Sequence, residues 1–120
     1  MANASFARVL NHVRELVAAH QTGTASDRDL LERFRNHREE AAFTLLAQRH
    51  GPMVLNTCRR ILGDVQEAED AFQATFLILA RRAGSVRWQA SVGGWLHTVA
   101  QRLAVRARKQ AEQRRIHERG

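Results

Sequence analysis

The chain has 120 residues, enough for one folded domain, and its apolar content of 44% argues against wholesale disorder. Residues 1–80 hold nine basic and ten acidic side chains, whereas residues 81–120 hold ten basic and two acidic ones, so the excess behind the net charge of +7 lies entirely in the last third. No apolar stretch is long enough to cross a membrane. We therefore expect a soluble domain with a basic end.

The N-terminus and the cysteine content narrow the class of protein further. The first twenty residues contain Arg8, Arg14 and Glu15 and lack an unbroken apolar run, so they do not resemble a secretory signal. A cytoplasmic location is the default expectation. The single cysteine, Cys58, excludes an internal disulfide framework and a multi-cysteine zinc site, and its apolar neighbours predict a packed thiol. Nothing in the composition predicts a cofactor.

The sequence predicts an all-α fold, a compact bundle of about four to five helices, because alternating β-branched runs are absent. A first helix is indicated by apolar residues that recur at three- and four-residue steps, namely Phe6, Val9, Leu10, Val13, Leu16 and Val17. Ser26 can cap the next helix, and Asp27 and Asp29 in its first turn suit the helix dipole. Asn36 and His37 are the predicted turn after it.

A longer apolar pattern follows and contains the only proline. Its members are Phe43, Leu46, Ala47, His50, Val54, Cys58 and Ile61. Pro52 cannot donate a hydrogen bond to the carbonyl of Gln48 and would ordinarily end a helix. The pattern nevertheless stays in phase across the break, since Phe43 and Val54 lie about three turns apart. We predict one kinked helix, with two helices as the alternative.

Two further helices complete the predicted bundle. Gly63 suits the position after a helix C-terminus and Asp64 can cap the next helix, predicted over residues 65–82. One face of that helix carries Ala68, Phe72, Phe76 and Leu79, and another carries Glu67, Asp70, Gln73 and Leu77. Residues 83–91 break the pattern before the last helix. Its apolar stripe ends near Gln110, so residues 111–120 are expected to be a helical extension or a disordered tail.

The basic arc of the last helix is the strongest chemical signal. One side of this helix is apolar, and the rest carries His97, Thr98, Gln101, Arg102, Arg106, Arg108 and Lys109. Guanidinium groups along one helix face fit phosphate spacing, and an aromatic side chain such as Trp88 in the preceding loop can stack an unpaired base. The alternative for the basic residues is a face that contacts only solvent. The alternative for Trp88 is a side chain that covers the core.

The sequence gives little support to catalysis. Glu67, Glu69 and Asp70 cluster at the start of a helix, where carboxylates favour the helix dipole whatever else they do. The six histidines form no metal-ligand motif, and Gly93-Gly94 lacks the flanking strand of a phosphate-binding loop. We expect neither catalytic residues nor a metal site.

Two stretches, in the correct order, resemble region 2 of bacterial RNA polymerase sigma factors of the extracytoplasmic-function type. The run from Leu62 to Leu77, LGDVQEAEDAFQATFL, resembles the "LGD…AEDLVQETFL" helix of that family. The last helix resembles the "WLxxIAxNxAxDxxRR" helix of the family. The matching pairs are Trp95-Leu96, Val99-Ala100, Leu103-Ala104 and Arg108-Lys109. The segment from Asp29 through Phe43, and then His50-Gly51-Pro52 and Val54, resembles the entry helix and the long kinked helix that precede them in the family. The resemblance covers about residues 26–112.

The resemblance implies a domain organisation and two macromolecular partners. It implies a sigma region 2-like domain over residues 26–112, an N-terminal helical extension over 1–25 and a basic tail over 113–120. Core RNA polymerase is the first implied partner, its β′ coiled coil docking on Glu67, Asp70, Gln73 and Leu77. The second is promoter DNA, the non-template strand of the minus-ten element, bound by Arg87, Trp88, His97, Thr98, Gln101, Arg102, Arg108 and Lys109. An anti-sigma factor is a further candidate partner.

The implied function is to bind core polymerase and to recognise and melt the minus-ten element. Arg102 and Arg106 depart from the family, which commonly has asparagine and aspartate there, and they make this face more basic than usual. Two other function classes stay open on the sequence alone. One is a general nucleic-acid-binding helical domain that acts without polymerase, and the other is a helical protein-interaction module whose basic tail is only solubilising.

Overall fold

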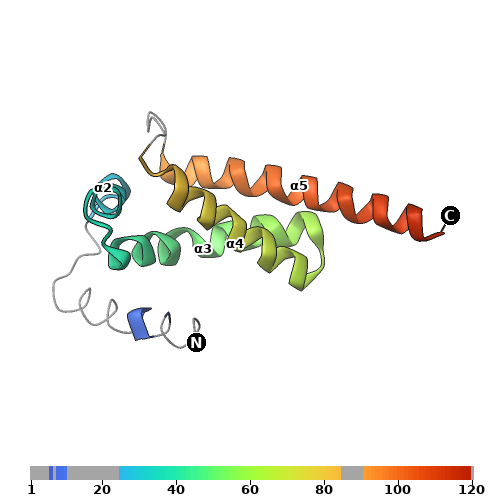
Figure 1. The fold of residues 1–120 in the computed structure, drawn as a ribbon, viewed down its shortest axis with the longest axis horizontal. Coiled ribbons are helices and arrows are strands. Elements are labelled where there is room, and N and C mark those ends of the chain that lie inside the picture. The colour runs from blue at the N-terminus through green and yellow to red at the C-terminus, as the bar shows by residue number, and fades with distance from the viewer. Residues whose placement is uncertain (1–5, 7, 11–24, 85–90, 120) are drawn as a thin grey trace.

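The computed structural model describes Phe6 and residues 8–10, 25–84 and 91–119, and these residues form an all-α bundle, as predicted (Figure 1). The bundle contains α2 (Asp27–His37), α3 (Glu40–Leu62), α4 (Val65–Arg82) and α5 (Val92–Arg119). Phe6 and residues 8–10 have helical backbone. Val13, Leu16 and Val17 of the predicted first helix lie outside the described residues.

Helix α3 is the centre of the bundle, because it packs against α2, α4 and α5. Helices α4 and α5 also pack against each other. Figure 1 shows α5 running along one side of this arrangement and continuing past α3 and α4 to its C-terminal end. The arrangement leaves α4 and α5 each with one face open to solvent.

The helix ends follow the predicted capping chemistry. The Ser26 hydroxyl accepts a hydrogen bond from the Asp29 amide at 3.0 Å, and the Asp64 carboxylate accepts one from the Glu67 amide at 2.9 Å. Gly63 has the left-handed conformation, with φ of 74°, and its amide donates to the Arg59 carbonyl. Two residues therefore suffice to connect α3 to α4. The end of α2 differs from the prediction, because the helix includes Asn36 and His37 and the left-handed turn residue is Arg38.

Helix α3 is continuous through Pro52, which confirms one helix and rejects two. The apolar stripe explains why the chain stays helical there. Val54 and Cys58 on one side of the proline and Leu46 on the other are all fully buried in the same core. Packing of that stripe offsets the single backbone hydrogen bond that proline removes.

The core joins residues from all four helices. Leu30, Leu46, Leu79 and Leu96 have no exposed surface and come from α2, α3, α4 and α5 respectively. A chain of aromatic contacts links three of these helices, from Phe34 to Phe43 at 4.8 Å between ring centroids, then to Phe76 at 6.3 Å and Phe72. Trp95 is partly buried and packs against this core.

The Cys58 side chain has no exposed surface, so the predicted packed thiol is confirmed. Burial raises the pKa of this thiol, because the apolar surroundings disfavour the charged thiolate. The thiol therefore acts as a small apolar core group.

Candidate functional site

Helix α4 presents an exposed stripe that we call the α4 stripe, made of Gln66, Asp70, Gln73, Leu77 and Arg81. These residues recur at three- and four-residue steps, so they share one face of the helix. The opposite face is buried through Ala68, Thr75 and Leu79. Leu77 stands out because 60% of its surface is exposed, although a leucine is normally buried. Three of the four predicted polymerase-binding residues, Asp70, Gln73 and Leu77, thus lie together on one solvent-facing stripe.

Asp70 is already in contact with its own helix. The Gln66 side-chain amide donates a hydrogen bond to one Asp70 carboxylate oxygen at 3.3 Å, on an exposed part of the surface. An exposed hydrogen bond of this kind exchanges readily with water or with a partner side chain, since its net contribution is about 1 kcal/mol. The Asp70 carboxylate is therefore available to an incoming basic group.

Glu67 is placed differently from the other three predicted residues. It is half-buried and lies in a hollow between α4 and α5, which we call the α4–α5 groove. The groove is lined by Glu67, Asp70, Ala71 and Ala74 from α4 and by Leu103, Arg106, Ala107, Gln110 and Arg114 from α5. The groove thus brings carboxylates of α4 to the same hollow as two arginines of α5. Glu67 borders the α4 stripe, but the side chains around it come from both helices.

Helix α5 presents a second exposed surface, which we call the α5 outer face. It consists of His97, Thr98, Gln101, Arg102, Val105, Arg108 and Lys109, all of which are exposed. Leu96, Ala100 and Ala104 on the other side of the helix are buried with no exposed surface. The structure therefore brings together all six described residues of the predicted DNA-binding set. Arg87 and Trp88, the other two, lie outside the described residues.

The α5 outer face is basic over most of its length. Arg102 and Lys109 are two turns apart on the same side of the helix, and both line an open hollow with Thr98, Gln101 and Val105. The Arg108 guanidinium lies 3.6 Å from the Glu112 carboxylate, with both side chains more than half exposed, so this ion pair is weak and accessible. The Thr98 hydroxyl donates to the Gly94 carbonyl at 3.1 Å and keeps its acceptor lone pairs free.

Val105 is a member of this face that sequence reasoning missed. It is 39% exposed and lies on the same side of α5 as Thr98 and Arg102. Its spacing from these two residues could have revealed its position, because seven- and three-residue steps return to one side of a helix. The apolar side chain gives an otherwise polar surface a contact for the apolar part of a nucleotide or a protein.

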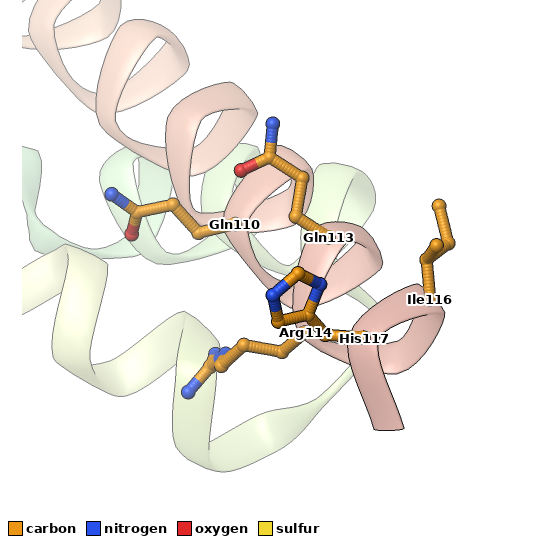
Figure 2. A pocket seen from close by; sticks show the side chains of 5 residues that line it. All are labelled: Gln110, Gln113, Arg114, Ile116 and His117. Carbon is orange, nitrogen blue, oxygen red and sulfur yellow. The ribbon is translucent and has the colours of Figure 1, made fainter. Parts of the chain in front are cut away.

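A separate hollow lies at the C-terminal end of α5 (Figure 2). It is lined by Gln110, Gln113, Arg114, Ile116 and His117, all from the same helix. One helix cannot surround a small molecule on several sides, which binding pockets for such ligands do. We therefore do not regard this hollow as a ligand site.

Two further kinds of feature, a metal-ligand cluster and a membrane-spanning helix, are absent from the described residues. Among them, no group of three or more His, Cys, Asp or Glu side chains could hold a metal ion. None of the described helices combines the length and the apolar character that crossing a bilayer requires.

A helical bundle with one mixed apolar and polar face and one basic face has surfaces suited to binding macromolecules. A family model, Sigma-70 region 2, matches residues 46–115, which include most of α3, all of α4 and nearly all of α5. Because the match covers more than half of the chain, the protein belongs to the sigma-70 region 2 family. No curated protein and no solved structure gives a match to the chain.

Membership of this family gives the chain a general role. Sigma-70 region 2 is a non-enzymatic domain of transcription initiation that acts in RNA polymerase binding and promoter recognition. The α4 stripe and the α5 outer face both fall within the matched residues. The extracytoplasmic-function type that the sequence resembles stays a prediction.

Proposed function

We propose that this chain binds core RNA polymerase through the α4 stripe and holds the non-template strand of the minus-ten promoter element against the α5 outer face. The observation that carries the proposal is the separation of the two surfaces. Asp70, Gln73 and Leu77 share one stripe of α4, whereas the cations Arg102, Arg108 and Lys109 share a face of α5. A domain that engages protein and DNA at once needs two such surfaces.

The chemistry of the α4 stripe suits a coiled-coil partner such as that of the β′ subunit. Leu77 offers an exposed apolar side chain that loses contact with water when a partner helix covers it. Asp70 and Gln73 beside it can pair with basic and polar side chains of that helix, which fixes the register of docking. Glu67 at the edge of the α4–α5 groove adds negative charge without being central to the stripe.

The α5 outer face suits a phosphate backbone. Arg102 and Lys109 lie about 10 Å apart along the helix, since seven residues rise 1.5 Å each. A nucleic-acid strand that crosses the face can therefore contact both cations through different phosphates. Thr98, Gln101 and His97 near the start of α5 carry hydrogen-bonding groups that can read base edges. Arg87 and Trp88 precede this end of the helix in the sequence, which favours the same end for an unstacked base.

Binding to core polymerase tests the first half of the proposal. Asp70→Ala and Gln73→Ala should each weaken the retention of the chain on immobilised core polymerase, and Glu69→Ala is the matched control. Glu69 is an exposed carboxylate one residue away but points off the α4 stripe. If the wild-type chain is not retained, the sigma assignment of function falls. If Glu69→Ala weakens retention as much as Asp70→Ala, the interface lies elsewhere on α4.

Binding to single strands tests the second half. Labelled oligonucleotides with the non-template minus-ten strand, its complement and a scrambled sequence are titrated with the chain at fixed salt. The proposal expects the non-template strand to bind most tightly and its affinity to fall as salt rises. Equal affinity for all three strands would favour a general nucleic-acid binder. Salt-independent binding would contradict both the proposed promoter binding and general nucleic-acid binding.

A further inference from the structure

His50, in the middle of α3, touches two other helices at the point where α5 begins. Its Nε2 atom lies 2.7 Å from Oδ2 of Asp27, the first residue of α2. The other edge of the ring faces Gly93, the second residue of α5. A Cβ atom at position 93 would lie 3.2 Å from Cε1 and 3.3 Å from Nδ1 of this ring. The imidazole is therefore held between a carboxylate and the backbone of α5.

The chemistry of the two sides is complementary. An ionised carboxylate can only accept hydrogen bonds, so His50 Nε2 donates to Asp27. In the neutral ring that leaves an unprotonated Nδ1 on the edge that faces the first turn of α5. The first amides of a helix lack backbone partners and carry partial positive charge, which a ring nitrogen lone pair attracts. Asp27 thus selects the tautomer of His50 that suits the start of α5.

Close approach of α3 to α5 depends on the absence of a side chain at position 93. A contact of 3.2 to 3.3 Å is tighter than nearly all contacts that a real Cβ atom makes. An alanine there would have to push either the His50 ring or the first turn of α5 aside. Gly93 and His50 are therefore fitted to each other.

We propose that Asp27 and His50 are positioning residues for the promoter-binding end of α5, because together they set where its first turn lies. The inference rests on the proposed function, in which that end binds the minus-ten strand. Gly93 lies one turn before His97, and the exposed DNA-binding candidates His97 and Thr98 follow directly from it. A shift of the first turn therefore shifts these side chains.

The position of the pair favours positioning over simple attachment of α2. Helix α2 already docks through Leu30, Leu31 and Phe34, which are buried in the core. Asp27 also forms an ion pair with Arg49 at 3.0 Å, and that pair joins α2 to α3. Within the described residues, the contact of this cluster with Gly93 is made by the His50 ring. Arg49 consequently serves as the matched control for His50.

The experiment compares five variants with wild type: His50→Ala, His50→Gln, Gly93→Ala, the double variant His50→Ala with Gly93→Ala, and Arg49→Ala. Each is measured for affinity to the non-template minus-ten strand, for affinity to core polymerase and for thermal unfolding. We expect His50→Ala and Gly93→Ala each to weaken strand binding about five-fold while polymerase affinity changes less than about two-fold. His50→Gln, whose amide nitrogen can replace Nε2 as donor, should recover most of the strand affinity.

The double variant is the decisive measurement. Once the ring is removed, a methyl group at position 93 has nothing to displace, so the double variant should bind the strand no more weakly than His50→Ala alone. Losses that multiply in the double variant would overturn the inference. So would an Arg49→Ala loss equal to that of His50→Ala, or a parallel fall in strand and polymerase affinity, since either would mean a general loss of packing.

The failure of this inference can be told apart from failure of the proposed function. A wild-type chain that does not discriminate the minus-ten strand from the scrambled strand overturns the proposed function, and this inference with it. A wild-type chain that discriminates the strands, with variants that bind as tightly as wild type, overturns this inference alone. The variants His50→Gln and Gly93→Ala leave no cavity in α3, so they keep the test valid if His50→Ala does not fold.

Discussion

The exposed faces of α4 and α5 have different chemistry although the two helices pack against each other. The α4 stripe holds one carboxylate, two side-chain amides, an exposed leucine and an arginine at its end. The α5 outer face holds three cations and, among its members, no carboxylate. The first surface is suited to covering by a protein and the second to contact with phosphates.

The comparison teaches that one small bundle can keep two kinds of partner apart. Neighbouring helices share a core, through Leu79 in α4 and Leu96 in α5, but expose surfaces of different chemistry, which the proposed function assigns to different partners. The α4 stripe offers phosphates less attraction than the α5 outer face, because it combines one carboxylate, Asp70, with one cation, Arg81. Substitutions in the core should therefore affect both activities, whereas surface substitutions should affect one.

The largest effect is expected from the shared core. Leu96→Ala removes a side chain with no exposed surface from the helix that packs on both α3 and α4. We expect it to lower the free energy of unfolding by about 2–5 kcal/mol and to weaken polymerase and DNA binding together. Denaturant titration measures the loss, and Val105→Ala, at an exposed position of the same helix, is the control. A loss below about 1 kcal/mol would show that α5 is not anchored as described.

The next effect should separate the two surfaces. Leu77→Asp places a charge in the centre of the α4 stripe, where Leu77 is 60% exposed, so folding should tolerate it. We expect core polymerase affinity to fall about ten-fold and strand affinity to stay within about two-fold. Val65→Asp is the control, because Val65 is 56% exposed on α4 but lies off the α4 stripe, about a third of a turn around the helix from Leu77. Similar polymerase affinities for the two variants would contradict the placement of the stripe.

A smaller and more specific effect is expected on the α5 outer face. The double substitution Arg102→Ala with Lys109→Ala removes two cations that can each contact a phosphate. The logarithmic salt dependence of single-strand binding should then become shallower by about 1.4, or about 0.7 for each lost contact. Arg33→Ala, at an exposed position of α2, should leave the slope unchanged. An unchanged slope in the double variant would mean that the strand does not lie on this face.

The smallest effect concerns the ion pair between Arg108 and Glu112. Both side chains are more than half exposed and 3.6 Å apart, so Glu112→Ala should change the free energy of unfolding by less than about 0.5 kcal/mol. Removing the carboxylate frees Arg108, and strand binding at low salt should become slightly tighter. Titrations at low and high salt measure this difference. Weaker strand binding would instead mean that Glu112 holds Arg108 in its binding orientation.

Local chemistry was sufficient to predict most of the fold. Ser26, Gly63 and Asp64 act on backbone groups within a few residues, so their spacing alone places helix ends. The helical spacing of the apolar residues predicted that α3 continues through Pro52, because the same buried stripe repeats before and after the proline. Of the two alternatives predicted for residues 111–120, the helical extension is confirmed up to Arg119, although the apolar stripe of α5 ends earlier. Residues of good helix propensity, such as glutamine, glutamate and arginine, explain this extension.

Long-range packing decided what the sequence could not show. Glu67 and Asp70 are three residues apart and looked equivalent, and both line the groove between α4 and α5, but packing leaves Glu67 half-buried and Asp70 exposed. The contact between Asp27 and His50 joins residues 23 positions apart, and the fit of Gly93 to that histidine depends on the packing of α3 against α5. No local pattern encodes such contacts, because they exist only once the helices have docked.

The two-residue connection between α3 and α4 has a consequence for how the chain folds. Closing so short a loop costs little conformational entropy, and the two helices that it connects pack against each other. Chains dominated by local contacts fold quickly. We expect the α3–α4 hairpin to form in the transition state for folding, with α2 and α5 condensing on it afterwards. Substitutions in the hairpin core should then slow folding, and substitutions at Leu30 or Leu96 should mainly speed unfolding.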